Sequence, residues 1–289
     1  MKKLNKTDII LSISHKDLDG CVCQVILANY FINITYVSTN YSDIDQLLNT
    51  IKYNQYDAIF LTDISPSSAY IFEITDKIIL IDHHDTAIQY HDPKKNRYVI
   101  SGYSGSWLVK KYMESVYKIN LDHLTNLVYL ANDYDMWVHH NKKSRMINEL
   151  FFYYWETGFR NRFLTGDTRF TNIELKLLRD RCNHFKDVVN NIEVNKLDKI
   201  PGCVVISKEF VNDICEKLLN EGYSIVFCIN PKNNRTSIRH RIENLHIGKF
   251  CENLKIGGGH KDAAGLTSTK LDEIKSNISK IEDLLVKFF

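Results

Sequence analysis

The sequence lacks any run of the ~20 apolar residues that a membrane-spanning helix needs. Its N-terminus carries two lysines but no apolar signal core. We therefore predict a cytoplasmic protein with no membrane partner. The formal net charge is only +2, so no strong basic field indicates binding to long nucleic acid. A small or short anionic substrate needs only a local positive patch and is not excluded.

The cysteines also lack the spacing of a disulfide framework. There are seven, an odd number, scattered along the chain. Cys21 and Cys23 form the one close pair, and a C-x-C pair is a weak metal signal. Two residues apart on a helix, they do not share a face. We expect both to be buried as small apolar side chains in a reducing compartment.

The first ~100 residues alternate β-rich runs with helical patterns. The predicted strands are 8–13, 34–39, 56–63 and 77–82, and the predicted helices are 20–31, 42–53 and 67–75. The strands are almost continuously Ile, Val and Leu, which is typical of strands buried on both faces. This alternation predicts an α/β fold with a doubly wound, mainly parallel sheet.

The rest of the chain predicts a helical connector and a second, smaller α/β domain. Residues 104–160 and 167–197 have apolar residues at helical spacing. Strand character resumes after Pro201-Gly202. We predict helices at 209–220 and 246–254, strands at 223–229 and 235–241, and a C-terminal helix. The predicted domains are 1–137, a connector at 138–199, and 200–289.

Polar residues with metal-binding side chains follow the predicted strands. In an open parallel sheet, functional groups collect beyond the carboxyl ends of the strands. His15, Asp17 and Asp19 follow the first strand, Asp63 ends the third, and Asp82, His83 and His84 end the fourth. The helical segment "ANDYDMW" adds Asp133 and Asp135. Four segments thus deliver carboxylates and imidazoles that the predicted fold could bring to one place.

Taken singly, several of these residues have a plain structural role. Asp19 is a candidate helix N-cap, and Asp63 could cap the turn at "SPSS". Taken together, their mutual repulsion has to be relieved, and cations would do this. Carboxylates with a few imidazoles suit Mn²⁺ or Mg²⁺, and the set contains no cysteine, which argues against structural zinc. So many carboxylates favour two ions ~3.5–4 Å apart, as in enzymes that hydrolyse phosphate esters.

Several motifs resemble those of a known superfamily. "SHKDLDG", the Asp of "LTDIS", "DHH" and "ANDYDMW" resemble, in this order, the four motifs of the DHH phosphoesterases. "RTSIRHR" followed by "GGGHKDAAG" resembles the DHHA1 domain that accompanies them. The resemblance covers roughly residues 1–137 and 200–270.

The resemblance implies a dinuclear metal site with two divalent cations, Mn²⁺ foremost, with Mg²⁺ or Co²⁺ as alternatives. The implied ligands are His15 and Asp17 for the first cation, Asp19, His83 and Asp135 for the second, and Asp63 bridging both. Asp135 is preferred to Asp133 as the ligand from the fourth motif, because the residues that follow it, "D-M-W", better match the motif of the family.

The resemblance also implies catalytic and substrate-binding residues. Asp82 would orient or ligate at the metal site, and His84 would face the scissile phosphate as a donor. In the second domain, Arg239 and the glycine run with Gly258, Gly259 and His260 would grip a phosphate or a terminal nucleotide. Three glycines let the backbone approach an anion in a nest-like curve.

The resulting functional hypothesis is a Mn²⁺-dependent phosphodiesterase that releases mononucleotides from very short RNA or DNA oligonucleotides. Alternatives are a phosphodiesterase for cyclic or linear dinucleotides, a phosphatase for the bisphosphate nucleotide pAp, a phosphoanhydride hydrolase, and a nucleotide sensor without turnover. The oligomeric state is left open, a homodimer included. Residues 149–163 are rich in aromatics; most should be core, and one or two could stack on a base.

Overall fold

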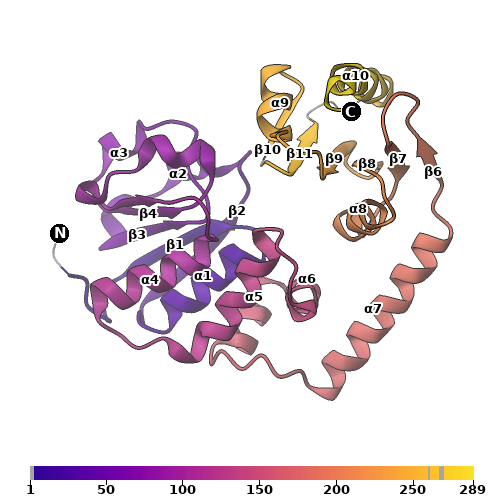
Figure 1. Ribbon diagram of the computed structural model, residues 1–289. Helices are drawn as coiled ribbons and strands as arrows, with labels where there is room; N and C mark the ends of the chain where they lie inside the picture. Colours follow the sequence, from indigo (N-terminus) through magenta and orange to yellow (C-terminus); the bar gives the residue numbers. More distant parts are fainter. Residues whose placement is uncertain (1–2, 260, 267–269) are drawn as a thin grey trace. The chain divides into compact units, whose positions relative to one another are not determined.

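The chain divides into two compact units, residues 1–178 and 179–289. The computed structural model describes residues 3–259, 261–266 and 270–289, and its elements are labelled in Figure 1. None of the helices in these ranges is both long and apolar enough to cross a membrane.

The first unit contains a five-stranded parallel sheet in the order β2-β1-β3-β4-β5. Its strands are β1 Ile10–His15, β2 Ile34–Thr39, β3 Ala58–Thr62, β4 Ile78–Asp82 and β5 Arg97–Val99. Four of them match the predicted strands to within two residues at each end, and β5 was not predicted. The α/β class and the parallel sheet are thereby confirmed.

Helices cover both faces of this sheet (Figure 1). Phe60 and Ile79 pack on one face with apolar residues of the helices that follow β1 and the last strands. Their neighbours Leu61 and Leu80 pack on the other face with Ile44, as strand alternation requires. The helices found between residues 18 and 190, not all of which lie on the sheet, are α1 Leu18–Ala28, α2 Ile44–Thr50, α3 Ile71–Ile74, α4 Gly105–Tyr117, α5 Thr125–Asp135, α6 Lys142–Phe163 and α7 Asn172–Asn190.

Much of the predicted connector belongs to the core of the first unit. The α6 residues Phe151, Phe159 and Phe163 are almost fully buried there. Helix α6 is kinked, because Trp155 has φ 52° and ψ 178° inside it. Helix α7 crosses the division between the units at Leu178.

The second unit contains a six-stranded mixed sheet in the order β10-β11-β9-β8-β7-β6. Its elements are β6 Val194–Lys196, β7 Gly202–Ile206, α8 Val211–Asn220, β8 Ile225–Asn230, β9 Arg235–His240, α9 Ile247–Asn253, β10 Gly257–Gly259, β11 Ala263–Leu266 and α10 Leu271–Leu285. Apolar clusters lie on both faces of this sheet. The smaller α/β domain predicted from the sequence is confirmed.

The glycine run forms a strand rather than the expected nest-like curve. Gly257–Gly259 is strand β10, which pairs antiparallel with β11 at the edge of the sheet. A Cβ at Gly257 would lie 2.0 Å from the carbonyl oxygen of Gly265. The close approach of two strands therefore accounts for this glycine without an anion.

Gly20, in the first turn of α1, allows the chain to turn tightly between β1 and α1. A Cβ at this position would lie 2.2 Å from the carbonyl oxygen of His15. Such a clash with backbone cannot be relieved by a rotamer change, so we expect Gly20→Ala to destabilise the fold by about 1–3 kcal/mol or more. Urea denaturation of the two proteins measures the difference, and an unchanged midpoint would contradict this reading of the turn.

Candidate metal centre

The carboxyl ends of three neighbouring strands carry the candidate site. His15 is the last residue of β1, Asp63 follows β3, and Asp82 is the last residue of β4. The strand order reverses direction between β1 and β3, which is where open α/β sheets bind ligands. Asp63 has a positive φ of 59°, a left-handed conformation that Asp tolerates better than most residues.

Asp17 is both the N-cap of α1 and a neighbour of the strand ends. Its Oδ1 accepts a hydrogen bond from the Gly20 amide at 3.0 Å, and its Oδ2 lies 2.6 Å from Nδ1 of His15. The cap assigned to Asp19 as its structural alternative thus belongs to Asp17. Nδ1 of His15 also lies 4.0 Å from Oδ2 of Asp63, so the first and third strand ends meet.

Asp19 lies further along the first turn of α1 and is buried at the start of α4. The Ser106 amide donates to its Oδ2 at 3.0 Å, and the Ser106 hydroxyl donates to its Oδ1. The positive end of the α4 dipole favours this carboxylate. Gly105 permits the approach, because a Cβ there would lie 2.7 Å from Cβ of Asp63 and 3.0 Å from Oδ2 of Asp19.

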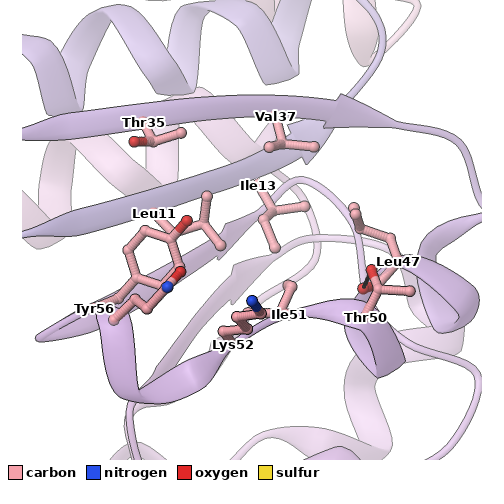
Figure 2. Close-up of a pocket in the computed structure, with 10 residues that line it drawn as sticks. Leu11, Ile13, Thr35, Val37, Leu47, Thr50, Ile51, Lys52 and Tyr56 are labelled. Carbon is pink, nitrogen blue, oxygen red and sulfur yellow. Dashed lines mark hydrogen bonds between the residues drawn. The ribbon is translucent and has the colours of Figure 1, made fainter.

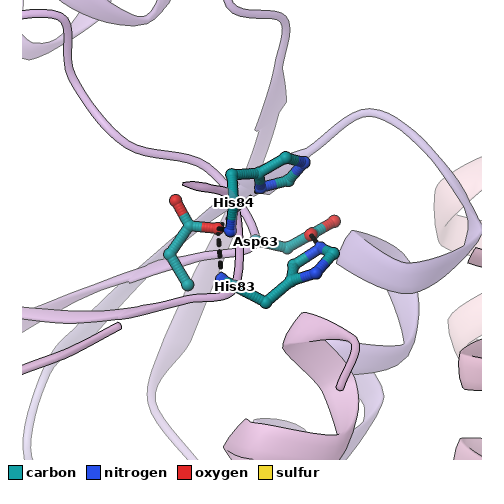
Figure 3. A group of neighbouring side chains, drawn as sticks. Asp63, His83 and His84 are labelled. Carbon is teal, nitrogen blue, oxygen red and sulfur yellow. Dashed lines mark hydrogen bonds and ion pairs between the residues drawn. The ribbon is translucent and has the colours of Figure 1, made fainter. Parts of the chain in front are cut away.

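His83 joins the strand ends to helix α5. Its Nε2 lies 3.1 Å from Oδ1 of Asp63 and 3.4 Å from Oδ2 of Asp135. Figure 3 shows its imidazole beside the Asp63 carboxylate. Asp133 lies elsewhere, because its two oxygens accept hydrogen bonds from the amides of His140 and Asn141. Of the two aspartates in the fourth motif, Asp135 is therefore the one that lies with the other site residues.

Asp82 is fully buried and holds the two histidines that follow it. Its Oδ1 accepts from the amide of His83 at 2.7 Å and lies 2.7 Å from Nδ1 of His84. Its Oδ2 accepts from the hydroxyl of Ser65. Although burial opposes ionisation, these donors hold the pKa of Asp82 below its usual range. Both carboxylate oxygens of Asp82 thus have partners within the protein, which fits a carboxylate that orients the neighbouring histidines.

Three sets of ligand atoms lie close enough together to hold a metal ion. They are Asp63, Asp82, His83 and His84, then His15, Asp17 and Asp63, and finally Asp19, His83 and Asp135. Asp63 belongs to two of the sets and His83 to two. Oxygen atoms with a minority of imidazole nitrogens are the donors that Mn²⁺ and Mg²⁺ accept.

Two buried oxygens in these sets are suited to bind cations. Among the described residues, Oδ2 of Asp63 and Oδ2 of Asp135 are buried side-chain atoms with no hydrogen-bond partner. Burial, together with the negative charges of Asp17 and Asp19, raises the pKa of Asp63 well above its usual range. Burial likewise raises the pKa of Asp135 to about 7. Since buried charges are paired or bind metals, this donor set fits divalent cations.

The residues predicted to bind substrate in the second unit are placed less completely. Arg239 lies on β9, where its guanidinium donates to the Ile238 carbonyl and to Oδ1 of Asn212, each at 2.8 Å. Gly258 and Gly259 lie in strand β10. His260 lies outside the described residues.

Three residues that the sequence analysis did not select contact the site. Tyr41, on the loop after β2, has its ring 5.2 Å from that of His15 and 5.3 Å from that of His84. Its hydroxyl lies 2.9 Å from Nδ1 of His84. Ser65 and Ser106 donate to Asp82 and Asp19. The two serines could have been selected from the sequence by their position, because Ser65 follows a strand and Ser106 lies at the start of a helix. No local sequence pattern marks Tyr41.

The first unit also contains a cavity that lies apart from these residues. Its volume is about 340 Å³, and Leu11, Ile13, Val37 and Tyr56 are among the residues that line it (Figure 2). None of its lining residues belongs to the three candidate metal sets. The cavity is therefore separate from the candidate metal centre.

Comparisons with known proteins agree with the resemblance in the motifs. Residues 205–287 match the DHHA1 domain family. The fold resembles the pGpG-specific phosphodiesterase PggH from Vibrio cholerae, with a TM-score of 0.59, 14% identity, and coverage of 96% of this chain and 99% of that one. It also resembles RecJ from Thermus thermophilus in complex with Mn²⁺, with a TM-score of 0.61 and 13% identity, over 100% of this chain and 53% of RecJ.

A third solved structure has the same fold. It is an exopolyphosphatase-related protein from Bacteroides fragilis, with a TM-score of 0.52, 14% identity, and coverage of 98% of this chain and 94% of that one. No curated protein matches the chain. The DHHA1 match over residues 205–287 and the fold shared with these proteins agree with the resemblance of the motifs to the DHH/DHHA1 phosphoesterases.

Proposed function

We propose that the protein is a metal-dependent phosphodiesterase that hydrolyses very short oligonucleotides. The observation that carries the proposal is the meeting of five aspartates and three histidines at three strand ends and on helices α1 and α5. Two of the buried carboxylate oxygens have no hydrogen-bond partner among the described residues. The nearly balanced charge favours short substrates over long ones.

The candidate ligands would form two neighbouring metal sites. His15, Asp17 and Asp63 would hold one divalent cation, and Asp63, Asp19, His83 and Asp135 a second. When bound, two such ions lower the pKa of a water molecule and offset charge on phosphoryl oxygens.

His84 would donate to the phosphate. Asp82 lies 2.7 Å from its Nδ1 and fixes the plane of the imidazole, as carboxylates do for catalytic histidines. Ser65 and the His83 amide hold Asp82 in turn. In the second unit, Arg239 would supply a planar cation to a substrate phosphate, and Gly258 and Gly259 would offer the backbone of an edge strand, with His260 following them.

A linear dinucleotide is the second candidate substrate. The likeness to PggH spans nearly the whole of both chains, whereas RecJ is about twice as long as the part that matches. Both candidates place a single phosphodiester at the metal centre, and they differ in the number of nucleotides accepted.

The test is hydrolysis by the purified full chain with Mn²⁺, Mg²⁺ or Co²⁺. The panel comprises 5′-labelled RNA of two to twenty-four nucleotides, pGpG, a cyclic dinucleotide, pAp and pyrophosphate. We expect mononucleotide release from two- to five-nucleotide RNA and little from the longest. No turnover of any compound would overturn the enzyme proposal, and equal cleavage of long and short RNA would overturn the proposed substrate length.

Tyr41 is expected to position His84 and His15 in this reaction. Because its ring lies against both imidazoles, we expect Tyr41→Ala to lower kcat about tenfold or more, with little change in KM. Tyr41→Phe keeps the ring and should stay within about threefold of the wild type. Tyr41 is 44% exposed, so neither variant should shift stability by more than about 0.5 kcal/mol.

The matched control is Tyr70→Ala, an exposed tyrosine at the start of α3, which should leave kcat unchanged. Steady-state kinetics on the best substrate of the panel measures all three variants. Equal kcat in Tyr41→Ala and the wild type would remove Tyr41 from the site.

A further inference from the structure

Trp155 interrupts helix α6 in a conformation that an aromatic residue rarely adopts. Its φ of 52° and ψ of 178° fall near a region that is essentially restricted to glycine. The side chain is 56% exposed, so core packing does not explain why a tryptophan occupies this position. Buried aromatics of the same helix, such as Phe151 and Phe159, supply the packing instead.

The kink at Trp155 lies beside the segment that carries two candidate metal ligands. The Trp155 ring centroid is 5.9 Å from Nζ of Lys16, and Lys16 stands between His15 and Asp17 in the chain. The next residue, Glu156, accepts a contact from Sγ of Cys21 through its carbonyl oxygen. The kink is thus fixed on α1 and on the loop that begins it, within the first unit.

The surface around Trp155 combines aromatic and cationic groups. Phe152 is 53% exposed, and its ring lies edge-on to that of Trp155 at 6.4 Å. Glu156 adds a carboxylate to this surface, and its Oε1 lies 4.0 Å from Nζ of Lys16. A half-exposed pair at this distance contributes little, so Lys16 can reach a phosphate instead.

We propose that Trp155 stacks on a nucleobase of the substrate, next to the phosphodiester at the candidate metal centre, while Lys16 pairs with a neighbouring phosphate. The proposal rests on the phosphodiesterase function and names the part of the substrate that is recognised outside the metal centre. Aromatic side chains beside a cation are the common platform for single-stranded nucleic acid, and stacking tolerates every base. The site would therefore favour base-bearing substrates without selecting their sequence.

The experiment compares two ligands that differ only in their bases. The ligands are an unlabelled RNA trinucleotide and the same trinucleotide with abasic sugars, bound to the full chain in Ca²⁺ and measured by isothermal titration calorimetry. We expect Trp155→Gly to weaken binding of the trinucleotide about 5- to 100-fold and to leave the abasic ligand within twofold. Trp155→Phe keeps a ring and should remain within about threefold of the wild type for both.

Two further variants separate stacking from folding. Glycine suits the φ and ψ of position 155, so Trp155→Gly should melt at or above the temperature of the wild type. Trp155→Leu keeps an apolar side chain without a ring, and it should lose trinucleotide binding as Trp155→Gly does. The matched control is Tyr153→Ala, which removes another half-exposed aromatic of α6 and should leave both affinities unchanged.

The outcomes also separate this proposal from the phosphodiesterase function. If wild type and Trp155→Gly bind the two ligands alike, or if both ligands lose affinity equally, the stacking proposal is wrong even where hydrolysis is intact. If binding depends on Trp155 and on the base but no panel compound is hydrolysed, stacking stands and the proposed reaction fails. If neither ligand binds to the wild type, both proposals are overturned.

Discussion

Replacing Asp63 with asparagine is expected to abolish hydrolysis while making the metal-free protein more stable. Asp63 is 1% exposed, and its Oδ2 is among the described buried atoms without a hydrogen-bond partner. Its pKa is raised well above the usual range, because burial and the charges of Asp17, Asp19 and Asp135 disfavour its ionised form. Asparagine has no carboxyl to ionise among these neighbouring carboxylates, so the metal-free fold no longer bears the cost of burying that ionisable group.

The buried, shared position of Asp63 determines the size of both the change in stability and the loss of hydrolysis. Replacing a buried carboxyl whose Oδ2 has no hydrogen-bond partner among the described residues should stabilise the metal-free protein by roughly 1–3 kcal/mol, or about 2–4 °C in melting temperature per kcal/mol. Asp63 is also shared between two candidate metal sets, so hydrolysis should fall about 10³-fold or more. Wild type at a Mn²⁺ concentration of about 100 Kd should gain about 2.7 kcal/mol, and Asp63→Asn should gain almost none.

The stability that Asp63→Asn gains is expected to depend on pH, because the wild-type carboxyl titrates and the amide does not. A carboxyl whose pKa is raised on folding binds more protons in the folded state, so stability falls as pH rises above the unfolded value near 3.9. The gap between metal-free Asp63→Asn and wild type should therefore widen from pH 5 to pH 8. Thermal melts in EDTA and in Mn²⁺ at both pH values measure it. Lower stability of the variant in EDTA, or an undiminished Mn²⁺ shift, would remove Asp63 from the metal centre.

The sequence predicts the location of the site better than its internal contacts. The strand-end rule selects His15, Asp63 and Asp82 because a parallel sheet must bring the carboxyl ends of its strands together. The same rule does not say which aspartate caps α1, since Asp17 and Asp19 are both polar and near the helix start. The structure assigns the cap to Asp17, because Asp19 is turned toward the amide of Ser106 on α4.

Contacts between segments distant in the sequence account for the remaining differences. Tyr41 reaches His84 across 43 residues of sequence, and a loop tyrosine has no periodicity to mark it. The glycines of 257–259 indicate close backbone approach, and the structure shows strand β11 as a close neighbour of this run. The short strands β5 and β6 have three residues each, too few for an alternation pattern to be recognised.

Asp82 is expected to respond in the opposite way to Asp63, although both are buried carboxylates at adjacent strand ends. Asp82 is fully buried, and its oxygens accept from the hydroxyl of Ser65 and the amide of His83 and lie 2.7 Å from Nδ1 of His84. Asp82→Ala would leave these donors in a buried place without their acceptor. We expect a loss of about 3–5 kcal/mol in the free energy of unfolding, with or without Mn²⁺.

Asp82→Asn separates the structural loss from the effect on His84. The amide keeps one acceptor oxygen, so the loss of stability should be smaller, about 1–2 kcal/mol. Hydrolysis should still fall about 10²-fold or more, because the neutral amide no longer fixes the His84 imidazole as a carboxylate does. The Mn²⁺-induced stabilisation should persist in this variant, since the other candidate ligands are intact.

Urea denaturation with and without Mn²⁺, together with kcat on the best substrate, distinguishes the two aspartates. The expected pattern is a metal-free protein stabilised by Asp63→Asn and destabilised by Asp82→Asn, with the Mn²⁺ shift lost only in the first. If Asp82→Asn instead loses the Mn²⁺ shift and gains stability in EDTA, Asp82 is a metal ligand like Asp63. Its contacts with Ser65 and the two histidines would then be features of the metal-free state alone.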